Sequence, residues 1–302
     1  MAGSDSTKAI FYALGANFSI FVAKAAAAFV TGSGAMLAEA VHSAADCGNQ
    51  GLLLLGMKRA DLPPTPDHPL GYGKATYFWS FLVAVMLFSV GGMFSLYEGW
   101  HKLHAPEPLQ QWGWAVGVLV FAIVVEGIST AACLREVNKV RGDRSVWRWF
   151  RESRQAELVV ILGEDLAALF GLIFALIAVV LTVVTGNPIY DAIGTLGIGA
   201  LLIVVAVLVA IEVKAMLIGQ SAEPEFTAEV RRFIEGRPEI AQVYNVITFQ
   251  LGDDVMLSVK AQVRSEGASA DGLVAGINAV EAAVKAKFPS IRWSFFEPDL
   301  AD

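Results

Sequence analysis

The sequence has few charged residues, few cysteines and no nucleotide-binding motif. Only 17% of its 302 residues are Asp, Glu, Lys or Arg, whereas about 25% is usual for soluble domains. A soluble enzyme is therefore not expected, and the net charge of −7 argues against a nucleic-acid binder. Cys47 and Cys133 lie far apart in apolar stretches and indicate no disulfide framework. No GxxxxGK[ST] motif occurs, which disfavours a nucleotide-driven pump.

What the chain has instead is long apolar stretches, six of which could each cross a bilayer, for which about 20 residues suffice. Seven basic residues crowd between Arg135 and Arg154, while the loops on the opposite side hold almost none. The positive-inside rule then predicts that both termini lie in the cytoplasm. The stretches run approximately over Ala9–Thr31, Ala35–Leu55, Ala75–Tyr97, Trp112–Cys133, Leu158–Val184 and Ile189–Ala210.

The last part of the chain is richer in charge and has a different pattern. Residues 220–302 contain 21 of the charged residues but no His and no Cys. We therefore predict an all-α six-helix transmembrane domain over residues 1–219, followed by a small cytoplasmic α/β domain over 220–302. Apolar spacing and turn signals predict its αββαβ order: helix Glu223–Gly236, strands Val243–Gln250 and Val255–Val263, helix Ser269–Phe288 and strand Ile291–Phe296.

Polar residues gather in the second predicted span, where they are costly and therefore functional candidates. At 100° per residue, five of them fall within an arc of about 100° on one helix face. His42 and Asp46 are four residues apart, so an imidazole nitrogen and a carboxylate oxygen can reach one cation such as Zn²⁺. The five residues are Glu39, His42, Asp46, Asn49 and Gln50.

Acidic residues in two further spans could complete such a site. The fifth span supplies Glu164 and Asp165, and the fourth supplies Glu126. Two helices with acidic and imidazole ligands at mid-membrane depth could form a tetrahedral metal site. The same residues could instead form a structural hydrogen-bond network between helices. Glu39 and Glu126 could support ligands rather than bind metal, and Glu164 points about 100° away from Asp165.

In order along the chain, four segments resemble motifs of the cation diffusion facilitators, a family of homodimeric transporters that exchange divalent metals for protons. Further segments, including LGEDLAALFG, are similar to the branch that contains a mitochondrial zinc transporter once described as a nuclear-receptor coactivator. The resemblance extends over nearly the whole chain and includes an αββαβ cytoplasmic domain. The four segments are AEAVHSAAD, DHPLGYGKA, YEGWHKLHAPEP and YDAIGTLGIGALLI.

This resemblance implies that His42, Asp46 and Asp165 are metal ligands. Zinc-selective members of the family usually have a histidine four residues before the fifth-helix aspartate, where this chain has Ile161. The fourth ligand is then Asn49, Glu164, a water molecule or dependent on the substrate.

The resemblance also bears on the loop after the second span. His68, with Asp67 beside it, matches one histidine of the family's loop motif, but Tyr72 replaces the other, which weakens an accessory metal site there. Lys74 matches a lysine near the family's dimer interface, although an interfacial snorkelling role is equally compatible with its position.

From these features we expect a homodimeric transporter that exchanges a divalent metal, above all Zn²⁺, for protons by alternating access. Its location would be a bacterial inner or plasma membrane, and no prosthetic group is expected. The oxygen-rich ligand set also suits Fe²⁺ or Mn²⁺, and Co²⁺ is a further alternative. A non-transporting metal-binding or assembly subunit remains open, whereas the apolar third and sixth spans disfavour a passive channel.

Overall fold

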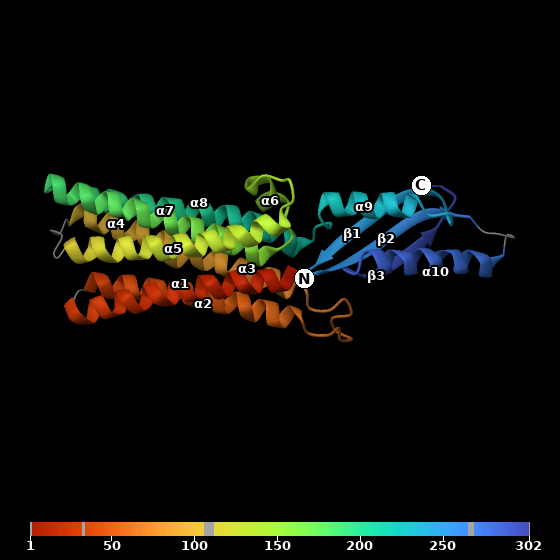
Figure 1. Cartoon of the computed structure of the whole chain (residues 1–302), viewed down its shortest axis with the longest axis horizontal. Helices are drawn as coiled ribbons and strands as arrows, with labels where there is room; N and C mark the ends of the chain where they lie inside the picture. Colours follow the sequence, from red (N-terminus) through yellow and green to blue (C-terminus); the bar gives the residue numbers. More distant parts are fainter. Residues whose placement is uncertain (1, 32–33, 106–111, 265–268, 302) are drawn as a thin grey trace.

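The computed structural model describes residues 2–31, 34–105, 112–264 and 269–301, without the side chains of residues 2–9, 27–28 and 30–42. Long helices run side by side in a bundle, and a small α/β part extends from one end of it (Figure 1). The bundle contains α1 (Ala2–Thr31), α2 (Gly34–Ala60), α3 (Ala75–Met86), η1 (Leu87–Met93), α4 (Phe94–His104), α5 (Trp112–Val140), α7 (Ala156–Thr185) and α8 (Ile189–Ile218).

Four described helical stretches are long and apolar enough to cross a membrane. The described apolar run of α1, Ile10–Ala26, is shorter, and α2 carries the predicted polar face. Each of the six predicted stretches lies within one helical stretch of the bundle. A helical membrane domain is therefore confirmed, while the count of six spans stays a prediction. The four stretches are Ala75–His104, Trp112–Val140, Ala156–Thr185 and Ile189–Ile218.

The helical stretch that starts with α3 is α-helical at both ends and π-helical in the middle. The π-helical segment η1 separates α3 from α4, and such segments inside α-helices are frequent at functional sites. Gly92 brings η1 close to α8, because a Cβ there would stand 2.5 Å from Cγ1 of Ile203. Small residues of this kind allow membrane helices to approach closely. One side of η1 is thus packed against α8, and another side faces α2.

The small part has the predicted αββαβ order, which confirms an α/β domain with three strands. Its sheet has the order β1-β2-β3, with β1 antiparallel and β3 parallel to β2. Alternate residues of β2, from Val255 to Ala261, form one apolar core with residues of both helices. The helices therefore cover one face of the sheet. The elements are α9 (Pro224–Glu235), β1 (Ile240–Leu251), β2 (Asp254–Val263), α10 (Ala270–Lys287) and β3 (Ile291–Pro298).

The basic loop between α5 and α7, which includes the short helix α6 (Val146–Glu152), contacts the linker to the small domain. Arg144 forms an ion pair with Glu223 at 2.9 Å. The Nε of Arg154 donates a hydrogen bond to the carbonyl oxygen of Ser221 at 2.7 Å. Arginines of the predicted cytoplasmic cluster therefore also hold the two domains together.

A second contact between the domains is formed by the turn of the β1–β2 hairpin. Gly252 in this turn has a φ of +69°, and its N–H donates a hydrogen bond to the Tyr77 hydroxyl of α3 at 3.0 Å. Gly73, just before α3, lies so close that a Cβ there would stand 2.0 Å from the carbonyl oxygen of Leu251. The hairpin can therefore dock only because position 73 has no side chain.

Replacing Gly73 by alanine should weaken this docking, because a backbone oxygen cannot move aside without a shift of the chain. Overpacking of this kind costs about 1–3 kcal/mol. We expect a lower unfolding temperature in detergent and faster proteolysis of the linker at residues 219–223. Gly117→Ala in α5 is the matched control, since a Cβ there meets nothing within 4 Å. Equal stability of both variants would contradict a role for the contact.

Candidate metal site

The polar face of α2 points into the bundle, as its spacing predicts for the described residues. Asn49 is 4% exposed, Gln50 is fully buried, and Asp46 is half-buried. The side chains of Glu39 and His42 lie outside the described residues, so their part in the site stays a prediction. No water in the bilayer core would satisfy these groups, and each therefore needs a partner within the protein.

The two acidic residues of α7 are both buried, but they face different neighbours. The Oε1 of Glu164 accepts a hydrogen bond from Nδ2 of Asn49 at 2.8 Å, and its Oε2 accepts one from Nε2 of Gln50 at 2.9 Å. The Oδ2 of Asp165 accepts a hydrogen bond from the Ser129 hydroxyl of α5 at 3.3 Å. Consecutive helical residues point about 100° apart, so Glu164 binds α2 while Asp165 turns toward α5.

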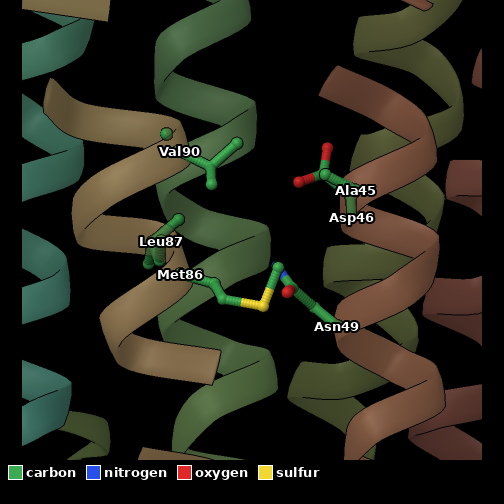
Figure 2. A pocket seen from close by; sticks show the side chains of 7 residues that line it. Ala45, Asp46, Asn49, Met86, Leu87 and Val90 are labelled. Atoms are coloured by element: carbon green, nitrogen blue, oxygen red, sulfur yellow. The ribbon is translucent and has the colours of Figure 1, made fainter. Parts of the chain in front are cut away.

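A small pocket lies between α2 and the end of α3 with η1. Figure 2 shows the Asn49 amide opposite the thioether of Met86, with the Asp46 carboxylate almost one turn earlier on α2. The Oδ1 of Asn49 is buried and has no hydrogen-bond partner among the described residues. A carboxylate and a free amide oxygen at one pocket are suitable ligands for a hard or borderline cation. The lining residues are Ala45, Asp46, Asn49, Met86, Leu87, Val90 and Gly91.

The acidic candidates whose side chains the structure describes do not form a ready-made metal-binding group. Among the described residues, no three His, Cys, Asp or Glu side chains lie close enough together to hold a metal ion. Glu126 is 2% exposed, and its carboxylate lies within electrostatic range of Asp46 and of both acidic residues of α7. The structure thus gathers the acidic residues in one buried region, while the ligand set itself stays a prediction.

Three polar residues that the spacing patterns do not single out also belong to this region. The Nζ of Lys24 in α1 donates a hydrogen bond to the Ser43 hydroxyl of α2 at 3.1 Å, and Lys24 is only 6% exposed. The Nδ2 of Asn17 in α1 donates a hydrogen bond to Oε1 of Gln50 at 3.3 Å. A lysine and an asparagine within an apolar span are themselves a visible signal, because such residues are rare there. Through these residues, α1 contributes hydrogen-bonding groups to the polar interior of the bundle.

Asp67 and His68, the candidates in the loop after α2, are exposed at the surface. The His68 ring stacks on Tyr72 with centroids 4.3 Å apart. Neither residue is part of a metal-binding group within the described part of the chain. An accessory metal site in this loop stays a prediction.

Lys74, the remaining candidate, lies just before α3. Its ammonium group lies 5.2 Å from the ring centroid of Phe249 in β1, at cation–π distance. Lys74 therefore contacts the small domain of its own chain, and a role between two chains stays a prediction.

Comparison with known proteins agrees with this architecture. Residues 10–218 match the cation efflux transmembrane domain. The mitochondrial proton-coupled zinc antiporter SLC30A9 of Homo sapiens is 35% identical over 224 residues, which are 74% of this chain but 39% of that protein. Metal tolerance protein C4 of Arabidopsis thaliana is 30% identical over 246 residues, or 80% of this chain and 53% of the relative. The zinc transporter ZitB of Escherichia coli is 23% identical over 266 residues, or 86% and 78%.

The chain thus spans about two fifths of the length of its mitochondrial relatives. The match to the transmembrane domain nevertheless covers more than half of this chain, and it includes α2, α5 and α7 with their buried acidic and amide groups. The chain is therefore an integral membrane protein that belongs to the cation efflux family, the cation diffusion facilitators, whose members are transporters and not enzymes.

Proposed function

We propose that this protein transports a divalent metal, most favourably Zn²⁺, in exchange for protons by alternating access. The observation that carries the proposal is the buried acidic and amide cluster between α2 and α7, within the matched cation efflux domain. The printed names of relatives, a proton-coupled zinc antiporter and a zinc transporter, support this choice of substrate. The metal is the cargo in this proposal and not a resident cofactor.

In this proposal His42, Asp46 and Asp165 bind the dehydrated ion, and Asn49 or Glu164 completes the site. Without carboxylates, a divalent ion could not enter a medium of low dielectric constant. Ligands must lose their protons to bind metal, so metal and protons compete for the same groups. Protons that enter from the opposite side would then displace the ion. His42 suits this exchange, since an unperturbed imidazole titrates near neutral pH.

The choice of Zn²⁺ over other metals depends on the imidazole. A site with one nitrogen and several oxygens suits Zn²⁺, Co²⁺ or Fe²⁺, whereas Mn²⁺ prefers oxygen ligands alone. Because Ile161 supplies no ligand, the site is richer in oxygen than a two-histidine site. Transport of Fe²⁺, Mn²⁺ or Co²⁺ is therefore the second candidate, and a non-transporting metal-binding subunit is the third.

The proposal includes an arrangement in the membrane. Residues 1–219 form the transport domain with six spans, in which α1 and α2 run alongside the other long helices (Figure 1). Both termini and the domain of residues 220–302 lie in the cytoplasm, as the basic loop next to that domain favours. The relatives include mitochondrial and bacterial proteins, and a bacterial inner or plasma membrane stays a prediction.

The small domain offers a surface for the proposed homodimer. The face of its sheet away from α9 and α10 carries apolar residues in two rows across the strands. In one row Ile247 and Phe295 flank Ser258, and both are more than half exposed. Exposed apolar groups that are contiguous on one face often mark a protein–protein interface. The second row is Phe249, Met256 and Trp293.

Transport by purified protein in liposomes tests the function. With an imposed pH gradient, we expect Zn²⁺ flux by the wild type, and no flux above background for Asp46→Ala or Asp165→Ala, because each removes a charge that compensates the ion. Acidifying the side from which metal is taken up should reduce flux, since protons compete for the ligands.

Asp61→Ala is the matched control for these variants, because Asp61 is an exposed aspartate just beyond the end of α2. Its flux should equal that of the wild type. Wild-type protein that moves no Zn²⁺, or an Asp46→Ala variant that moves it equally well, would refute zinc antiport. Metal binding without flux would instead favour the non-transporting subunit.

Placing a charge on the open sheet face should separate the dimer. Phe295→Glu puts a carboxylate into the apolar row, and burying it unpaired would cost several kcal/mol. Light scattering of the detergent-solubilised variant should then give the mass of one chain, while the wild type gives two. Val274→Glu on α10 is the control, because Val274 is similarly exposed but lies on a covering helix. A dimeric Phe295→Glu variant would exclude this face as the interface.

A further inference from the structure

We propose that Glu164 is a positioning residue that orients the Asn49 amide, so that the amide oxygen of Asn49, and not the carboxylate, is the fourth metal ligand. This inference rests on the proposed function and resolves the choice that it leaves open. It assigns Glu164 the task of holding α2 in a binding-competent arrangement.

Both oxygens of Glu164 already have hydrogen-bond partners. One oxygen accepts a hydrogen bond from Asn49 at 2.8 Å, the other accepts one from Gln50 at 2.9 Å, and the side chain is only 4% exposed. These bonds direct one acceptor position of each oxygen toward the amides of α2. Glu164 also does not line the pocket beside Asp46, whereas Asn49 does, so the carboxylate is less well placed than Asn49 to serve as a ligand.

The hydrogen bond between Asn49 and Glu164 determines which end of the Asn49 amide faces the pocket. Both oxygens of Glu164 accept hydrogen bonds, and Asn49 presents its NH₂ group to Glu164. Its Oδ1 then points away from Glu164. That atom is buried, lacks a hydrogen-bond partner among the described residues, and belongs to a residue that lines the pocket beside Asp46. A buried acceptor without a hydrogen-bond partner is unusual, and coordination of a metal ion would satisfy this oxygen.

Gln50 also donates a hydrogen bond to Glu164, but its amide oxygen is not left without a partner. Its Nε2 donates to Glu164, but its Oε1 accepts a hydrogen bond from Asn17 in α1. Both ends of the Gln50 amide are therefore satisfied, and Gln50 does not line the pocket. The two amides that share one carboxylate thus differ: one is structural, and the other has an oxygen available to a cation.

The residues that support metal ligands commonly affect metal affinity by about 10- to 100-fold when they are changed. Glu164→Gln removes one acceptor oxygen and introduces an NH₂ group that faces the two amides. Asn49 is then free to rotate its oxygen away from the pocket. We expect Zn²⁺ affinity, measured by calorimetry on the full chain in detergent, to fall by about 10- to 100-fold, and KM for transport to rise with it.

Two double variants separate positioning from simple stabilisation. In Glu164→Gln with Asn49→Asp, the hydrogen bond is reversed, and the second oxygen of the new aspartate can face the pocket. In Glu164→Gln with Gln50→Glu, the other hydrogen bond is reversed and the total charge is equal. We expect both to recover thermal stability, and only the variant with Asn49→Asp to recover most of the Zn²⁺ affinity.

Each outcome decides the proposal. Equal affinity of the two double variants, or wild-type affinity of Glu164→Gln, would show that Glu164 only stabilises the bundle. Wild-type affinity of Asn49→Ala together with lost affinity of Glu164→Gln would show that Glu164 binds the metal directly. If the wild type binds no Zn²⁺ at all, the proposed function fails instead, so the two failures are distinguishable.

Discussion

The structure depends on one constraint: polar groups within the helical bundle have no bulk water and must find partners in the protein. Glu164 provides hydrogen-bond acceptors for two buried amide groups of α2. Its two hydrogen bonds link α7 to α2, and Gln50 also accepts a hydrogen bond from Asn17 of α1. Lys24 and Ser43 form a second link between α1 and α2. These links fix the relative rotation of three helices, which apolar packing alone would specify less sharply, because it is not directional.

This arrangement gives the two sides of α2 different properties. Toward α1 and α7, α2 is held by directional hydrogen bonds between buried groups, which are costly to leave unmade. Toward η1, the pocket is lined by apolar side chains such as Met86 and Leu87. Apolar contacts are not directional, so such side chains can change neighbours without leaving a polar group unsatisfied. Asp46 and Asn49, two ligands of the proposal, therefore lie on α2 between its hydrogen-bonded side and its apolar side.

Much of this organisation can be predicted from local patterns. The spacing of Asp46, Asn49 and Gln50 places them on one helix face, and the step between Glu164 and Asp165 predicts their divergence. Both features depend only on the 3.6-residue helical period. The α/β domain follows equally from alternation and turn signals. In contrast, the partners of Lys24 and Asn17 depend on how whole helices are rotated against one another, which the period of a single helix does not contain.

The contacts between the domains and the direction of the Asn49 amide likewise cannot be predicted from local sequence patterns. Tyr77 and Gly252 are 175 positions apart, and no local pattern couples them. Asn49 could present either end of its amide to the pocket, since both ends fit a polar helix face equally well. The carboxylate of Glu164 on a different helix distinguishes them, because its two oxygens accept hydrogen bonds from amide groups of α2. The chemistry of the site is therefore a property of a helix pair: α2 supplies most of the candidate ligands, while α7 supplies Asp165 and, through Glu164, determines which atom of Asn49 is presented.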